Sequence, residues 1–221
     1  MRTRKSFGIA ICGLFIVSAA GLARANYYDD PIEVDVSGPY TQAATGMIFP
    51  ESVKDFRRDD VISYNSERTD ESATYIQEKD GKEQIAITVY VYPVPADLGT
   101  ALVQALPKDD LVGAWYMLGQ QLFDEEEQGI VELHRGAELL DGGETSFDQH
   151  GINYPGAVST FRYDEDFFGR VQKVRSQLQL FPMVGGKWMV KYRVTYPEGI
   201  DGAAQANAFV HALPWTIRGL K

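Results

Sequence analysis

The sequence predicts an α+β fold, in which an antiparallel sheet of about seven strands packs against a long central helix and a C-terminal helix. Three observations support this prediction. Runs of β-branched and aromatic residues, separated by turn-forming residues, occur on both sides of a middle segment whose apolar residues recur with helical spacing, and a second helical pattern closes the chain. Each helical pattern has one apolar stripe, which a sheet face would bury.

The first group of strands lies between residues 61 and 92. Residues 61–65 and 73–79 have short strand patterns, and Ile85 to Tyr92 is the strongest, because β-branched and aromatic residues crowd it and Pro93 ends it. Asp80-Gly81 forms a favoured hairpin turn ahead of this strand. One face of the strand is aliphatic and the other is small or aromatic, so we expect a central strand that is covered on both faces.

The middle segment changes to a helical period, and we expect a helix from about Lys108 to Gln128 with Gly129 near its end. Its apolar stripe consists of Leu111, Trp115, Leu118 and Leu122. The acidic run from Asp124 to Glu127 then lies at the unfavourable end of the helix dipole. We expect this last turn to fray or to be held by a basic partner.

Strand patterns return after Gly136 and form an antiparallel meander. The four expected strands are Ala137 to Leu140, Ala157 to Tyr163, Gln172 to Phe181 and Lys187 to Tyr196. The expected turns between them are Asp141-Gly142-Gly143, Asp164-Glu165-Asp166 and Gly185-Gly186. Strict alternation in the last strand places Lys191 and Arg193 on the face opposite Trp188 and Tyr192.

The closing helix begins after Pro197, where Asp201 would cap it. Its expected buried stripe is Ala206, Phe209, Val210 and Leu213, and Pro214 ends it.

Residues 1–25 have the organisation of a secretory signal peptide. Three basic residues within the first five precede an apolar run from about Phe7 to Ala20, and Ala23-Arg24-Ala25 supplies the small residues that signal peptidase requires. The apolar run has about 14 residues, whereas roughly 20 are needed to span a bilayer. We therefore expect cleavage near Ala25 and a periplasmic or secreted protein that keeps no stable membrane anchor.

Removal of 25 of the 221 residues leaves a mature chain of 196, with 17 of the 21 basic and all 31 acidic side chains. We interpret residues 26–45 as a polar lead-in segment and residues 46–221 as a single α+β domain. The formal charge of −14 repels nucleic acid, and the only cysteine, Cys12, leaves with the signal peptide. No familiar metal, phosphate-binding or nucleophile motif is present, so we expect no metal and no cofactor.

Three segments of the sequence resemble segments of known proteins. They are Phe49-Pro50-Glu51-Ser52 ahead of Phe56-Arg57-Arg58, the strand Thr88-Val89-Tyr90-Val91-Tyr92-Pro93, and the closing run Lys191-Tyr192-Arg193-Val194-Thr195-Tyr196-Pro197. With the element order from about Phe49 to Leu213, the chain resembles a group of exported bacterial proteins of unknown function, and its layout resembles the Mog1/PsbP-like fold. The resemblance implies a binding or accessory role and carries over no catalytic residue.

Two sets of residues are candidates for the functional site. Tyr90, Tyr92, Lys191 and Arg193 would face a groove and recognise an extended peptide or a glycan by stacking and charged hydrogen bonds, unless helices cover that face and the tyrosines are simply core. Asp148, His150 and Tyr154 would place a carboxylate, an imidazole and a phenol together for acid/base work, unless they only form a polar loop.

The sequence thus favours an exported, non-enzymatic binding or envelope-accessory protein, whose partner is an unknown envelope protein, a peptide or a glycan. The alternative is a cofactor-free hydrolase with His150 as the general base.

Overall fold

The computed structural model describes residues 30–80, 82–95, 113 and 119–218. Eleven strands are present in this part of the chain: β1 Ile32–Glu33, β2 Tyr40–Thr41, β3 Ile48–Phe49, β4 Ser52–Val53, β5 Phe56–Ser63, β6 Glu71–Lys79, β7 Lys82–Pro93, β8 Glu138–Gln149, β9 Ile152–Asp166, β10 Val171–Val184 and β11 Trp188–Pro197. The helices are α3 Gln120–Leu133 and α4 Ala203–Ala212. The α+β class expected from the sequence is confirmed.

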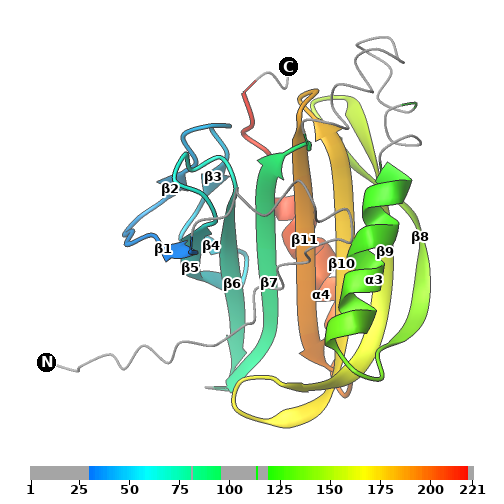
Figure 1. Ribbon diagram of the computed structural model, residues 1–221. Coiled ribbons are helices and arrows are strands. Elements are labelled where there is room, and N and C mark those ends of the chain that lie inside the picture. Colours follow the sequence, from blue (N-terminus) through cyan, green and yellow to red (C-terminus); the bar gives the residue numbers. More distant parts are fainter. Residues whose placement is uncertain (1–29, 81, 96–112, 114–118, 219–221) are drawn as a thin grey trace, which may run out of the picture.

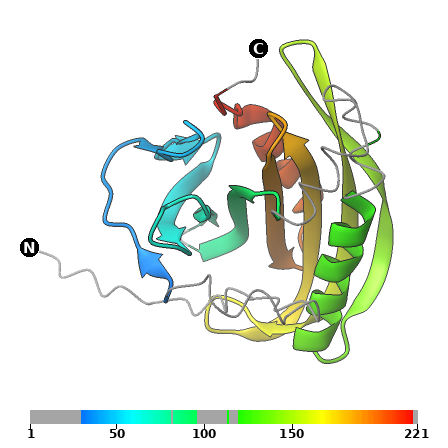
Figure 2. The same cartoon turned by 45° about the horizontal axis from the view of Figure 1, so that its top comes forward.

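A single antiparallel sheet dominates the molecule (Figure 1). Its strand order is β1-β5-β6-β7-β11-β10-β9-β8, with β4 paired to β5, while β2 and β3 form a separate two-stranded sheet. The large sheet has nine strands rather than about seven, because two short strands, β1 and β4, each pair with β5. Helices α3 and α4 lie on opposite faces of the sheet (Figure 2).

Two expected turns lie inside strands, which corrects the sequence prediction. Asp141-Gly142-Gly143 belongs to β8, next to a bulge between Leu139 and Asp141, and the hairpin turn is His150-Gly151, where both residues have positive φ (54° and 77°). The acidic run 164–166 belongs to β9, because its Asp164 pairs across the ladder with Lys173, 3.5 Å away. The expected Gly185-Gly186 turn is confirmed by positive φ at both glycines.

The central helix also differs from the prediction. Its described part, α3, runs five residues past the expected end, and Gly129 is buried within it. The reason is that Ile130, only 1% exposed, gains burial from the next turn. Leu122 of the expected stripe is buried. Leu111, Trp115 and Leu118 lie outside the described residues.

The sheet separates two hydrophobic cores. On the α4 side, alternate residues of β11 from Trp188 to Tyr196 pack with the expected stripe of α4, which confirms both patterns. On the α3 side, a smaller core contains Leu122, Phe123 and Ile130 of the helix. The expected cap at Asp201 is wrong: Gly202 is the N-cap and makes no side-chain capping bond. Any Cβ at Gly202 would lie 2.4 Å from the Tyr196 ring, so this close approach needs glycine.

Part of the lead-in segment is tied to the sheet. Glu71 of β6 is completely buried, and its carboxylate accepts hydrogen bonds from the Tyr40 hydroxyl (2.7 and 2.8 Å) and from Nε of Arg68 (2.9 Å). Gln42 donates to the carbonyl oxygen of Val91 at 3.2 Å. A buried carboxylate is tolerated only when it is paired and hydrogen-bonded, so these contacts fix residues 40–42 against the domain.

Candidate functional site

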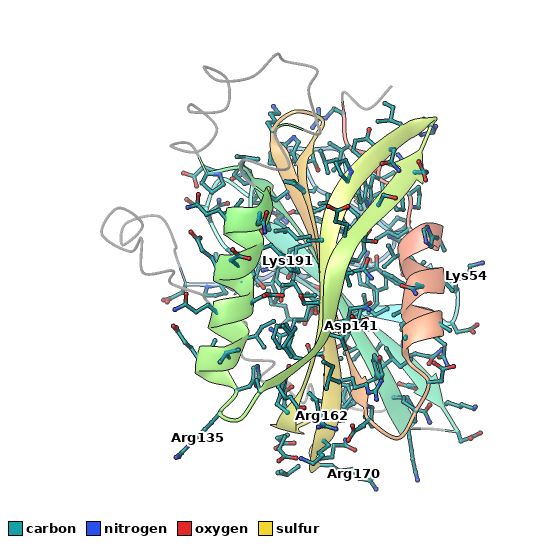
Figure 3. The ribbon with its side chains drawn as sticks, turned by 90° about the vertical axis from the view of Figure 1, so that its right-hand side faces the viewer. Lys54, Arg135, Asp141, Arg162, Arg170 and Lys191 are labelled. Carbon is teal, nitrogen blue, oxygen red and sulfur yellow. The ribbon has the colours of Figure 1, made fainter. Side chains whose placement is uncertain are left out.

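A layer of polar side chains lies between α3 and the centre of the sheet, where Figure 3 shows Lys191 beside the helix. Strand alternation produces it: Lys191 lies directly opposite Tyr90 in the ladder between β11 and β7, and Arg193 lies opposite Thr88. All four residues of the first candidate set are on this face. We call the polar layer the set Tyr90, Tyr92, Glu126, His134, Tyr163, Ser176, Lys191 and Arg193.

Lys191 is held by a carboxylate and two aromatic rings. Its Nζ donates to both carboxylate oxygens of Glu126, at 2.9 and 3.1 Å, and lies 4.5 Å from the ring centre of Tyr90 and 5.6 Å from that of Tyr92. The two charged side chains are only 15% and 20% exposed. Burial, the largest single influence, lowers the pKa of Lys191, but the Glu126 carboxylate and the Tyr90 phenol together outweigh burial and leave that pKa raised. The ammonium is therefore charged at neutral pH.

Arg193 is surrounded by neutral acceptors. Its Nη2 donates to the Tyr163 hydroxyl at 2.6 Å and to Nε2 of His134 at 3.2 Å, and its Nε donates to Oγ of Ser176 at 3.0 Å. Arginine has no acceptor, so Nε2 of His134 accepts and the imidazole proton resides on Nδ1. Among the described residues, no carboxylate oxygen lies within 4.0 Å of this guanidinium.

His134 follows α3 directly and closes one side of the Arg193 environment. Its ring stacks on Tyr163, with ring centres 3.9 Å apart and planes inclined by 19°. Burial, together with the neighbouring Arg193 charge, lowers the pKa of His134 to about 4. The imidazole is therefore neutral at physiological pH, as its role as acceptor requires.

The phenols of the layer are uncharged. Burial raises the pKa values of Tyr90 and Tyr163. Burial also raises the pKa of Glu165, although the nearby Arg193 charge opposes this shift.

Polar contacts attach much of α3 to the sheet. Glu126 bonds Lys191, Glu127 accepts a hydrogen bond from the hydroxyl of Ser159, and His134 at the end of the helix bonds Arg193. The sequence signal for the first two contacts was the acidic run from Asp124 to Glu127, which was expected to form the last turn and to have a basic partner. The position was wrong, because α3 continues to Leu133. Lys191 is such a basic partner. Sequence reasoning did not find the contributions of His134, Tyr163 and Ser176, because no local pattern distinguishes them.

The structure does not bring the second candidate set together. His150 is exposed in the β8–β9 turn, and Asp148 accepts a hydrogen bond from Asn153 at 3.0 Å. Tyr154 is 3% exposed and packs in the core on the α4 side, 5.3 Å from the ring centre of Trp215. Tyr154 pairs with Phe147 across the ladder, so the adjacent Asp148 lies on the opposite face.

The described part of the chain lacks two further features. No group of three or more histidine, cysteine, aspartate or glutamate side chains is arranged to hold a metal ion there. Within the same part of the chain, no helix is long and apolar enough to cross a membrane.

Comparison with known proteins adds a weak structural likeness. No family model matches the chain, and no curated protein matches it. A solution structure of cyanobacterial PsbP (CyanoP) from Synechocystis sp. PCC 6803 is 12% identical, with a TM-score of 0.39, and the match covers 82% of this chain and 95% of that one. A mutant of protein Mog1 is 17% identical, with a TM-score of 0.33 and coverage of 83% and 89%. The expected Mog1/PsbP-like resemblance is confirmed in this weak form.

Proposed function

We propose that this chain is an exported, non-enzymatic binding or envelope-accessory protein that recognises its ligand at the polar layer. One observation carries the proposal: Lys191 and Arg193 lie two residues apart on a central strand, both partly buried, beside Tyr90 and Tyr92. A purely structural sheet face is usually apolar at its centre, because buried charges contribute little net stability. Charged hydrogen-bond donors beside aromatic rings are instead typical of ligand recognition.

The contacts between α3 and the polar layer are of a kind that a ligand can replace. Three of its contacts with the sheet are hydrogen bonds from Lys191, Ser159 and Arg193 to groups of the helix and its cap. A ligand with hydrogen-bond acceptors would replace these bonds, and the donors of Lys191, Ser159 and Arg193 would then still have partners. An extended peptide or a glycan has such acceptors, and its apolar faces would stack on Tyr90 and Tyr92.

Export is the second part of the proposal, and it rests on the amino-terminal pattern of residues 1–25. Terminal sequencing of the protein recovered from the periplasm or medium should find a start near Asn26, in a product that remains in the supernatant after a carbonate wash. A product that retains Met1, or one that sediments with membranes, would contradict this part.

The binding function is tested by complementation of a deletion strain that has an envelope phenotype. Replacing Tyr90 and Arg193 by Phe and Gln should abolish rescue, whereas replacing His150 by Asn should leave it intact. Arg57→Gln is the matched control for loss of an arginine, because Arg57 is on the surface with a side chain that is 69% exposed. Circular dichroism and melting curves of each variant exclude unfolding as the cause. Loss of rescue with the folded His150 variant alone would overturn the binding function and favour a hydrolase.

A further inference from the structure

Arg193 has donors that the described part of the chain does not use. Its hydrogen bonds to Tyr163, His134 and Ser176 engage Nε and Nη2, and Nη1 donates to no described residue. Arginine presents five N–H donors in a planar fork, and a buried donor without a partner is unfavourable. Because Arg193 is only partly buried, Nη1 is free to take an acceptor from solvent or from a ligand.

The charge of Arg193 is also poorly balanced. Lys191 has its own carboxylate in Glu126, so this pair is neutral. The three partners of Arg193 are a phenol, a neutral imidazole and a hydroxyl, and Glu165 acts on its charge only from beyond 4.0 Å. A partly buried cation without a paired carboxylate favours an anion as its partner.

We infer that Arg193 binds the carboxylate group of a small organic acid or of a peptide C-terminus, and that Glu126 competes with this ligand from within the protein. This inference rests on the proposed function and names the chemical class of its ligand. A carboxylate accepts charge-assisted hydrogen bonds from Nη1 and brings one negative charge. A phosphate brings up to two charges into a layer that already contains Glu126, with Glu165 nearby, in a chain of formal charge −10.

The contact between Glu126 and Lys191 is an example of a carboxylate bound in the polar layer. Both oxygens accept from Nζ of Lys191, and the rings of Tyr90 and Tyr92 lie against the same ammonium. Lys191 and Arg193 are roughly 7 Å apart along the strand, so an anion on Arg193 lies close enough to repel Glu126 or to take its place on Lys191. Removal of the Glu126 charge should therefore favour the ligand.

The test measures binding of defined probes to the mature protein by calorimetry. Sodium benzoate represents a small aromatic acid, and N-acetylphenylalanine represents a peptide C-terminus. Benzamide and N-acetylphenylalanine amide are the neutral controls, and phenyl phosphate tests the choice of anion. We expect one of the two acids to bind, its amide to bind at least about tenfold more weakly, and phenyl phosphate to bind more weakly than benzoate.

The variants locate the site. Glu126→Gln should tighten binding of the acid severalfold, and Arg193→Gln should weaken it about tenfold or more, while Arg57→Gln leaves it unchanged. If Arg193→Gln fails to fold, the affinity of Glu126→Gln for the acid tests the inference. This variant should fold, because the Glu126 side chain is partly exposed. Equal binding of acid and amide, tighter binding of the phosphate, or no effect of Glu126→Gln would overturn the inference.

Failure of the inference and failure of the proposed function are distinguishable. If neither acid binds, but the Tyr90 and Arg193 variant still loses complementation in the folded state, the ligand class is wrong and the binding function stands. If that variant complements fully, the proposed function fails as well.

Discussion

The two faces of the sheet differ in what holds their helices. On the α4 side, aromatic rings interlock: Phe209 makes edge contacts with Phe56 and Tyr75, at 5.1 and 4.9 Å between ring centres. On the α3 side, buried apolar contacts at Leu122, Phe123 and Ile130 alternate with hydrogen bonds and an ion pair. The same strands serve both faces, because alternate residues of each strand point in opposite directions.

This difference separates stability from recognition. Apolar burial on the α4 side contributes stability roughly in proportion to area, and it is non-directional. The polar contacts on the α3 side add little net stability, because burial of charged groups offsets their attraction. We therefore expect large losses of stability from changes on the α4 side, and smaller losses with specific effects from changes in the polar layer.

The largest effect is expected for Phe209→Ala. This side chain is completely buried between α4 and the sheet, and its loss leaves a cavity that the surrounding aromatic rings cannot fill. The free energy of unfolding should fall by about 3–5 kcal/mol. Urea titration followed by tryptophan fluorescence measures it, with the exposed Val131→Ala as control. A loss below about 1 kcal/mol would mean that the α4 side is not the stability core.

A smaller effect is expected for Gly156→Ala, which tests how closely β9 and β10 are packed. A Cβ at this position would lie 2.6 Å from the carbonyl oxygen of Leu180 and 2.6 Å from Cδ1 of Phe181. Because one of these atoms is backbone, the strands must shift, and we expect a loss of about 1–3 kcal/mol. Gly143→Ala in β8 is the matched control, since its Cβ would meet nothing within 4 Å. Equal melting temperatures for the two variants would contradict the expectation.

The ion pair between Glu126 and Lys191 should contribute little to the free energy of unfolding, but the effects of replacing its two members should be coupled. Glu126→Gln leaves Lys191 without its carboxylate, and we expect a loss of about 1–2 kcal/mol, less than for a fully buried pair because both side chains are partly exposed. Lys191→Met should cost a similar amount, and the double variant should cost less than the two losses added. A double-mutant cycle in urea measures this coupling, and strict additivity would show that the pair is energetically silent.

The sequence was informative where the pattern is local. Strand alternation was enough to place Lys191 and Arg193 on one face of β11, and helical periodicity identified the buried stripe of α4. That Tyr90 lies opposite Lys191 depends on the pairing of β7 with β11, two strands about a hundred residues apart. Shared strand character predicts such a pairing only in general, because many registers satisfy the same alternation.

The sequence was less informative where tertiary contacts override local preference. The glycines at 142 and 143 look like a turn, but they occupy an edge strand whose true turn is His150-Gly151. His134 has no motif, and it becomes part of the polar layer only because α3 extends to Leu133 and delivers it to Arg193 and Tyr163. Its role is therefore a consequence of where the helix ends, which local signals locate poorly.

The smallest expected effect is a pH dependence that arises from His134. Its folded pKa, about 4, lies below the ordinary value of 6.5, so the unfolded chain takes up the proton first as the pH falls. Neutral His134 therefore contributes fully above about pH 6.5, and its contribution is lost as the pH falls toward about 4. Because solvent screens a half-buried ring, we expect a loss of about 1 kcal/mol, with Arg193 as the main opposing charge. Urea titrations at pH 7 and 4.5 measure this loss.

His134→Gln, which retains an acceptor for Arg193, should flatten the pH dependence of stability, whereas His150→Asn at the exposed turn should preserve it. Identical pH profiles for wild type and His134→Gln would show that the histidine is solvated, and the polar layer would then be more open than the contacts of Arg193 indicate.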